Sequence, residues 1–162
     1  METFSGRVWL MGDDIDTDII LPTEYLIYKT IDEMKPYAFS PLRTDLAGAI
    51  KPGDIIVAGN NFGCGSSREQ APEVVKALGI KCIVAKSFAR IFYRNAINNG
   101  LLLIENPNLC EDITEGDEIT VNADTISYGG REYPIAALPE NLVEIIEAGG
   151  LVKAMRKRNG LD

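Results

Sequence analysis

The chain has 162 residues, of which 46% are hydrophobic and 25% charged, and its net charge is −8. This length supports one domain with its own hydrophobic core, so we expect a single domain over residues 1–162. An acidic chain repels a phosphate backbone, which argues against nucleic acid as a partner.

No segment has the features of a membrane or export signal. Apolar runs such as 55–58 and 101–104 are far shorter than the ~20 residues that cross a bilayer. The first residues, METFSGRVWLMGDD, show no basic region followed by an apolar stretch. We therefore expect a cytoplasmic protein with no membrane partner.

The cysteine and histidine content excludes several kinds of site. Cys64, Cys82 and Cys110 are the only cysteines, they are widely spaced, and there is no histidine. Without CxxC spacing, neither a disulfide framework nor a self-contained zinc or iron–sulfur site is indicated, so we predict no metal site on this chain. Without histidine, the chain holds no Ser-His-Asp triad, and Cys64 has no histidine to activate it as a nucleophile.

The first third of the chain begins with a predicted strand and continues as a long loop. In residues 6–11, Val8 and Leu10 alternate with Arg7 and Trp9, as is typical of a strand. The stretch 23–49 has weak periodicity, and we expect a loop with short helical pieces. Loops of this length often carry function.

An alternating pattern of strands and helices follows. Strands are predicted at 55–58, 82–85 and 101–104, with helices at 69–78 and 88–98 between them. This order favours a parallel sheet covered by helices. The second predicted helix has Phe88, Ile91, Phe92 and Ala96 on one face. The remaining predicted elements are short antiparallel strands at 117–121, 124–128 and 131–135, then helices at 139–148 and 151–158.

A glycine-rich loop at 60–70 precedes the first of these helices. Ser66 with Glu69, or Ser67 with Gln70, fits a capping box. The positive end of the helix and the planar guanidinium of Arg68 together favour a carboxylate. The residues alone leave two interpretations open, a well-capped turn and an anion site. The absence of a P-loop lysine argues against a nucleotide.

Several segments resemble signatures of the mobile domain of the aconitase superfamily. Gly63–Glu69 resembles its GxGSSRE motif, Lys86–Phe92 resembles its SFARIF segment, and Asn95–Leu101 resembles the "N…NNGLL" that follows. Asp16–Pro22 resembles the DTDxIxP motif of free-standing small subunits. The match covers most of the first 105 residues in the expected order, with Gln70 as a departure where many bacterial relatives have histidine.

The resemblance implies an α/β fold, the swivelling three-layer β/β/α domain, and a hydro-lyase reaction in which water leaves and returns across a carbon–carbon bond. It implies no cofactor on this chain. A [4Fe–4S] cluster and most substrate contacts would belong to a large subunit, in a heterodimer or heterotetramer.

The resemblance also implies roles by position. Ser66 would be the general base, and Ser67, Arg68 and Gly65 would bind a carboxylate of a small dicarboxylate. Asp16 and Asp18 would orient the site or lie at the subunit interface, and capping of a local turn is an equal alternative.

A specificity loop is implied at Leu26, Ile27, Tyr28 and Lys29. Small subunits of the homoaconitase type have a YLRT-like sequence here, and Ile27 stands at the position of its arginine. Burying a carboxylate arm of the substrate without a cation beside it would be costly. An apolar arm instead gains ~0.8 kcal/mol per buried CH₂. We predict isopropylmalate over homocitrate or citrate, with citraconate or 2-methylmalate second, although Lys29 would supply a cation if the loop turned the other way. The alternative of another class is a stand-alone anion-binding module.

Overall fold

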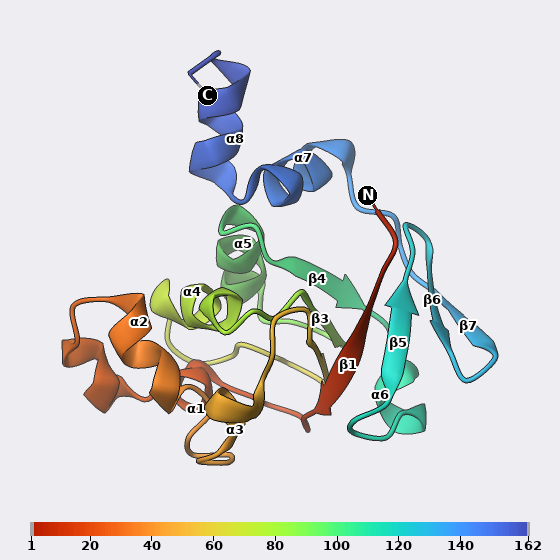
Figure 1. Cartoon of the computed structure of the whole chain (residues 1–162), viewed down its shortest axis with the longest axis horizontal. Helices are drawn as coiled ribbons and strands as arrows, with labels where there is room; N and C mark the ends of the chain where they lie inside the picture. Colours follow the sequence, from red (N-terminus) through yellow and green to blue (C-terminus); the bar gives the residue numbers. More distant parts are fainter. Residues whose placement is uncertain (1, 162) are drawn as a thin grey trace.

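The computed structural model describes residues 2–161 and contains one mixed sheet with the strand order β4-β3-β2-β1-β5-β6-β7 (Figure 1). The strands are β1 (Phe4–Leu10), β2 (Ile55–Ala58), β3 (Cys82–Ala85), β4 (Leu102–Glu105), β5 (Glu118–Val121), β6 (Thr125–Tyr128) and β7 (Arg131–Pro134). The α-helices are α1 (Thr17–Ile20), α2 (Ile31–Met34), α3 (Leu46–Ala49), α4 (Gln70–Ala77), α5 (Arg90–Asn98), α6 (Leu109–Asp112), α7 (Glu140–Ala148) and α8 (Leu151–Arg158). Two 3₁₀ helices, η1 (Thr23–Ile27) and η2 (Lys35–Tyr37), complete the list.

The first four strands form the predicted parallel half. Val8 pairs with Ile55, Ile55 with Cys82, and Cys82 with Leu102. All residues of β2 and β3 are buried, as expected for strands covered on both faces.

The second half of the sheet is antiparallel and begins on β1, which pairs with β2 on one side and β5 on the other. The sheet curls at β1, so that one face of the parallel half packs against the antiparallel half. Val57 and Val84 share a hydrophobic cluster with Ile119 and Ile126, which lie on the antiparallel strands. Helices α4 and α5 cover the opposite face. The predicted three-layer β/β/α fold is therefore confirmed.

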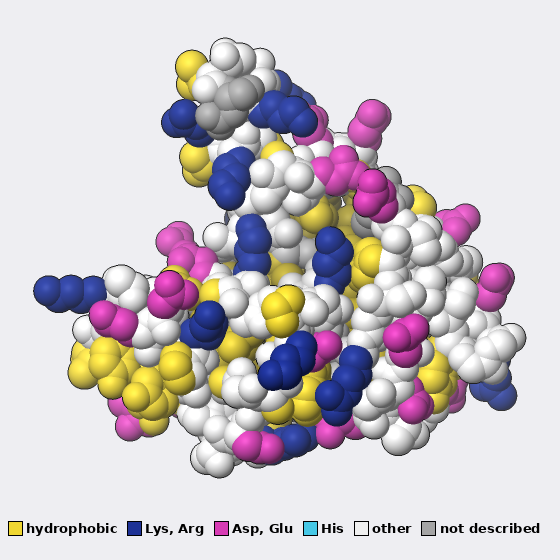
Figure 2. All heavy atoms as spheres, in the orientation of Figure 1, with side chains coloured by type: hydrophobic (Ala, Val, Ile, Leu, Met, Phe, Trp, Pro, Cys, Tyr) yellow, Lys and Arg dark blue, Asp and Glu magenta, His cyan; other side chains and the backbone are white. Residues whose placement is uncertain are grey.

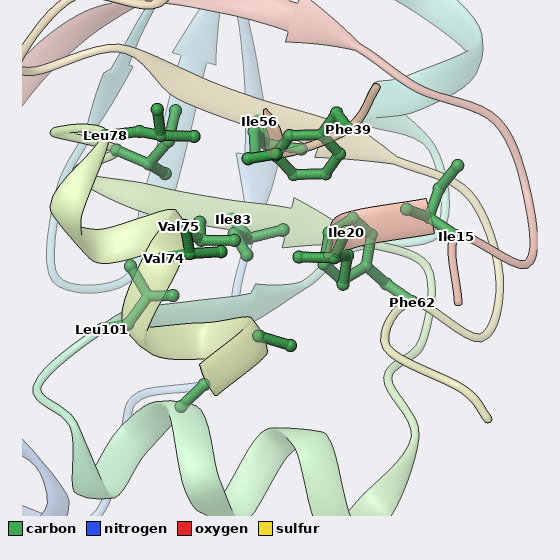
Figure 3. Packing of buried hydrophobic residues seen from close by; sticks show 14 of the residues in the cluster. Ile15, Ile20, Phe39, Ile56, Phe62, Val74, Val75, Leu78, Ile83 and Leu101 are labelled. Carbon is green, nitrogen blue, oxygen red and sulfur yellow. The ribbon is translucent and has the colours of Figure 1, made fainter. Parts of the chain in front are cut away.

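A second cluster fills the space between the sheet and the helical layer (Figure 3). Ile56 and Ile83 from the sheet meet Val74 and Val75 from α4 there. The predicted loop at 23–49 contributes Phe39, which is fully buried, so this segment is a packed part of the core. The short helices of this segment also place Met34, Leu46 and Ala47 in the same core cluster.

Two local features differ from what the sequence pattern indicates. Helix α6 was not predicted, because its single turn is too short for its periodicity to be recognised. Of the residues on the apolar face of the second predicted helix, Phe92 and Ala96 are buried, whereas Ile91, in the first turn of α5, is 54% exposed.

The C-terminal helix α8 stands away from the body of the molecule (Figure 1). Figure 2 shows lysine and arginine side chains gathered on it, while acidic side chains are spread over the rest of this face. None of the helices in residues 2–161 combines the length and apolar character that a bilayer crossing requires.

Candidate functional site

Three loops meet where the parallel strands β1, β2 and β3 reach their carboxyl ends. The backbone N–H of Thr17 donates to the carbonyl of Cys64 at 2.8 Å, and that of Gly63 donates to Ile15 at 2.7 Å. On the other side, Phe62 N–H donates to the carbonyl of Ser87 at 3.1 Å. Ligand sites in open α/β sheets form at this edge, so the loop that resembles GxGSSRE lies where chemistry is expected.

Two glycines allow the serine loop, which we define as residues 63–68, to follow this path. Gly63 has a φ of +85° and Gly65 a φ of +96°, in the region where other residues are strained. A Cβ on Gly65 would come within 3.3 Å of the Thr17 hydroxyl. The loop is therefore seated closely on the start of α1.

The predicted capping box is absent. The N-cap of α4 is Glu69, which already has helical dihedral angles and makes no side-chain capping bond. Ser66 and Ser67 lie before the helix and are exposed, and neither hydroxyl bonds to another residue in the described part of the chain. The reason is that Glu69, after both serines, is the N-cap position and already has helical dihedral angles. Both hydroxyls therefore remain available to a ligand.

A cavity of about 210 Å³ opens beside the two serines. Its lining comes from the serine loop, from α1 and from α5: Thr17, Gly63, Gly65, Ser66, Ser67, Arg68, Ala89, Arg90, Ile91, Phe92 and Asn95. A larger cavity of about 330 Å³ lies beside β4, but its lining is mostly apolar and includes none of the predicted site residues. We assign the candidate site to the smaller cavity, because there hydroxyls and a guanidinium converge.

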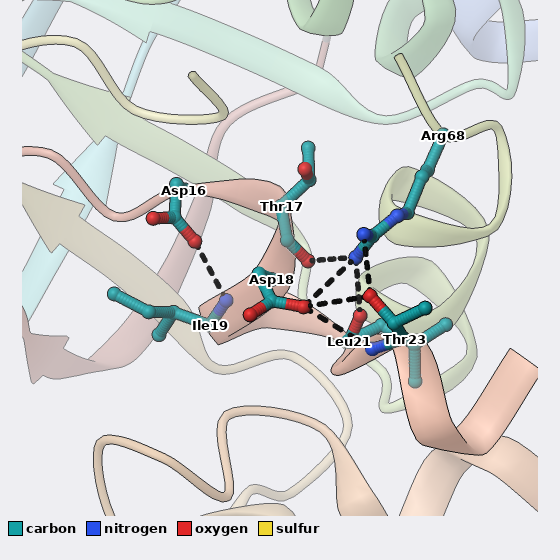
Figure 4. Close-up of polar contacts among 7 residues, drawn as sticks. All are labelled: Asp16, Thr17, Asp18, Ile19, Leu21, Thr23 and Arg68. Atoms are coloured by element: carbon teal, nitrogen blue, oxygen red, sulfur yellow. Dashed lines mark hydrogen bonds and ion pairs between the residues drawn. The ribbon is translucent and has the colours of Figure 1, made fainter. Parts of the chain in front are cut away.

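Arg68 is anchored on the backbone of the segment that contains α1 (Figure 4). Its Nη1 donates to the carbonyl of Leu21 at 2.9 Å and, at 3.4 Å, to the carbonyl of Thr17. Its Nη2 donates to Thr23 Oγ1 at 2.7 Å. Its side chain is only 14% exposed. No described residue accepts a hydrogen bond from its Nε, so the Nε–Nη2 edge retains donor capacity.

Asp16 and Asp18 both hold local structure. Asp16 is the N-cap of α1 and accepts from the N–H of Ile19 at 2.8 Å. Asp18 accepts from the hydroxyl of Thr23 at 3.0 Å and from its N–H at 3.2 Å. These bonds, with a smaller contribution from Arg68 at 3.4 Å, lower the pKa of the Asp18 carboxyl. Asp16 therefore has the capping role that was one of the two alternatives. Asp18 is connected to Arg68, and so to the candidate site, through Thr23.

Cys64 is a poor nucleophile in this setting. Partial burial raises the pKa of its thiol, and the nearby carboxylates of Asp16 and Asp14 raise it further. Burial raises the pKa of Cys82 much more strongly. Thiols of this kind stay protonated and unreactive at neutral pH.

The implied specificity loop, Leu26 to Lys29, does not line the cavity. Leu26 and Tyr28 pack partly against the core. Tyr28 belongs to a stack of three rings with Tyr25 and Tyr37, and the ring centroids of Tyr25 and Tyr37 are 4.1 Å apart. Ile27 is 81% exposed, and Lys29 is also exposed. The loop therefore presents an apolar side chain outward, next to a stack of three tyrosine rings.

Several lining residues were not singled out from the sequence. Thr17, Ile91 and Asn95 border the cavity, and Thr23 holds Arg68. Thr17, Ile91 and Asn95 lie in segments that carry the resemblance, which was the available signal. The contact between Thr23 and Arg68 spans 45 positions and has no local signature.

Comparisons with known proteins agree with this geometry. Residues 33–109 match the model of the aconitase C-terminal domain. The chain is 73% identical to the 3-isopropylmalate dehydratase small subunit of Lachnospira eligens, over 99% of both chains. The chain belongs to the aconitase family. Within that family it is also 49% identical to the isopropylmalate/citramalate isomerase small subunit of Methanocaldococcus jannaschii, over 94% of both chains.

A solved structure of the same family has the same fold. The crystal structure of 3-isopropylmalate dehydratase (LeuD) from Methanocaldococcus jannaschii superposes with a TM-score of 0.92 at 40% identity, over 99% of this chain and 97% of that one. Aconitase-family membership therefore extends over the whole described chain, including α7 and α8, which lie beyond the matched domain model.

Proposed function

We propose that this chain is the small subunit of a 3-isopropylmalate dehydratase, a hydro-lyase that interconverts 2-isopropylmalate and 3-isopropylmalate in leucine biosynthesis. The observation that carries the proposal is the 73% identity with the Lachnospira eligens small subunit over essentially the full length of both chains. The serine loop beside a small polar-edged cavity supports it.

Ser66 acts as the general base in this proposal. The reaction removes a proton from a carbon next to a carboxylate, while the hydroxyl on the adjacent carbon departs as water, and the reverse addition at the other carbon gives the isomer. The Ser66 hydroxyl is exposed beside the cavity and is not used for capping. An ordinary serine is a weak base, so its anion needs the guanidinium of Arg68, the positive end of α4 and charges of the partner.

Arg68, with Ser67 and Gly65, binds a substrate carboxylate. The two carbonyls that hold Nη1 are neutral, so they orient the guanidinium without cancelling its charge. Its Nε–Nη2 edge has the spacing that matches the two oxygens of a carboxylate. A lysine offers no such fork, because its charge sits on one nitrogen.

A large subunit completes the enzyme. Among the described residues, no group of three or more cysteine, aspartate or glutamate side chains is arranged to hold a metal ion, and the three cysteines lie on a loop, a strand and a helix. We place the [4Fe–4S] cluster of the family on the large subunit, where iron would polarise the departing hydroxyl.

The substrate arm is the second element of the proposal. Ile27 offers an exposed apolar surface, which suits an isopropyl group better than a third carboxylate. The Methanocaldococcus jannaschii relative is named for both isopropylmalate and citramalate. This favours 2-methylmalate and citraconate, whose arm is also apolar, as second substrates.

The test is reconstitution with candidate cluster-bearing large subunits, assayed on isopropylmalate, citraconate and homoaconitate. We expect turnover of isopropylmalate by the pair, and neither turnover nor stoichiometric iron with the anaerobically prepared chain alone. A preference of the reconstituted enzyme for homoaconitate would contradict isopropylmalate as the main substrate. Anion binding by the chain alone, with no partner that restores turnover, would favour the stand-alone module.

A further inference from the structure

Building on the proposed function, we propose that Thr23 is a positioning residue that joins Arg68 to the specificity loop, so that the carboxylate contact and the arm contact of the substrate are held as one unit. Thr23 is not part of the cavity lining, and it is not one of the loop residues implied by the resemblance.

The joint is a chain of three side chains (Figure 4). Arg68 Nη2 donates to Thr23 Oγ1 at 2.7 Å, the shortest of the hydrogen bonds that Arg68 makes to described residues. Thr23 Oγ1 in turn donates to Asp18 Oδ1 at 3.0 Å, and the Thr23 N–H donates to the same oxygen at 3.2 Å.

The chemistry of the three groups fixes the direction of these bonds. A guanidinium only donates and an ionised carboxylate only accepts, whereas a hydroxyl has one proton and two lone pairs. Asp18 therefore accepts the hydrogen bond from the Thr23 hydroxyl, and a lone pair of Thr23 Oγ1 accepts the hydrogen bond from Arg68. A residue without a hydroxyl at position 23 cannot make either bond.

Because Thr23 begins η1, its hydrogen bond with Arg68 also affects the position of that helix. Thr23 is the first residue of η1, and η1 ends at Ile27, so one short helix carries the hydrogen-bonded end and the exposed apolar end. The other end of the segment rests on the tyrosine stack. A change at Thr23 therefore shifts both Arg68 and Ile27, although these two residues lie far apart in the sequence.

Asp18 orients the joint without taking the charge of Arg68. Its carboxylate is 3.4 Å from Nη1 and its side chain is 64% exposed, so solvent weakens this pair. The guanidinium keeps its positive charge for a substrate carboxylate, and its orientation comes from neutral oxygens of Leu21, Thr17 and Thr23.

The first arm of the test uses the full chain alone and does not depend on activity. Thr23→Val has nearly the same shape but lacks the hydroxyl, and Thr23→Ser keeps it. Thr44→Val is the matched control, because Thr44 is exposed and bonds through its side chain to no described residue. Hydrogen–deuterium exchange of residues 17–29 should rise at least about fivefold in Thr23→Val and stay within about twofold of the parent in the other two variants. Unchanged hydrogen–deuterium exchange in Thr23→Val would overturn the proposal that Thr23 joins Arg68 to the specificity loop.

The second arm uses the enzyme reconstituted with its large subunit. Loss of a hydrogen bond to a charged group should raise KM for isopropylmalate by about tenfold in Thr23→Val, with kcat changed by less than about threefold. The kcat/KM ratio between isopropylmalate and 2-methylmalate should also change, and Thr23→Ser should restore both values. A purely structural role predicts a lower melting temperature with KM and the substrate ratio unchanged, and that result would overturn the proposal. An inactive parent enzyme would count against the proposed function, while the exchange experiment would still decide the joint.

Discussion

A Cβ atom on Gly63 would lie 2.2 Å from Cγ of Phe92, so the serine loop and α5 are in direct backbone-to-ring contact. Phe92 is buried and packs edge-on against Phe62, with ring centroids 5.4 Å apart. This contact sets how closely the serine loop approaches α5, and the candidate cavity lies between them.

Gly63→Ala should therefore damage both stability and activity. The substitution combines a strained φ with overpacking against the buried Phe92 ring, and we expect a loss of about 2–4 kcal/mol in the free energy of unfolding. Gly116→Ala is the control, because Gly116 also has a positive φ, +94°, but has open space around it. It should lose only about 1 kcal/mol. Equal losses in urea titrations would show that the Phe92 contact contributes nothing.

Ser66→Ala should affect the chemical step alone. In the reconstituted enzyme we expect kcat to fall by roughly 10²–10⁴-fold, as for loss of a positioned base, with KM nearly unchanged. The melting temperature of the chain should not change, because the hydroxyl is exposed and bonds to no described residue. Ser67→Ala is the neighbouring comparison and should act mainly on KM. If kcat of Ser66→Ala stays within a few fold of the parent, the base lies elsewhere.

Arg68→Lys should weaken both substrate binding and the packing of α1. Lysine cannot form the two-point contact with a carboxylate, so KM should rise, by about tenfold or more. It also cannot reach Leu21 and Thr23 together, so the melting temperature of the chain should fall. Arg94→Lys, on the exposed side of α5, is the matched control and should change neither. If the KM of Arg68→Lys equals that of the parent, Arg68 does not bind the substrate carboxylate.

Ile27→Arg should change which substrate is preferred. The side chain is 81% exposed, so the fold should tolerate the change, and Ile27→Leu controls for it. If the loop reaches the substrate arm as proposed, an arginine there adds a cation beside that arm, so activity on isopropylmalate should fall and some activity on longer tricarboxylates should appear. The measurement is kcat/KM for each substrate. An unchanged preference would mean that the loop does not reach the arm.

Sequence reasoning recovered most regular elements of this fold. The strands at 55–58 and 82–85 were placed to the residue, because short β-branched runs between glycine-rich turns are a strong local signal. The three antiparallel strands near the C-terminus were also found. The pairing of β1 with β5 was not, because it joins residues more than 110 positions apart and leaves no periodic trace.

By itself, the sequence determined most of the regular elements, the parallel half of the sheet and the serine loop, because these depend on local periodicity, glycine positions and a motif within a few residues. Only the tertiary structure decided that Ser66 and Ser67 are not caps, that Ile91 borders a cavity, and that Arg68 is held by Thr17, Leu21 and Thr23. These features arise where loops distant in the chain meet at one edge of a sheet. Their geometry depends on long-range packing, which no local pattern encodes.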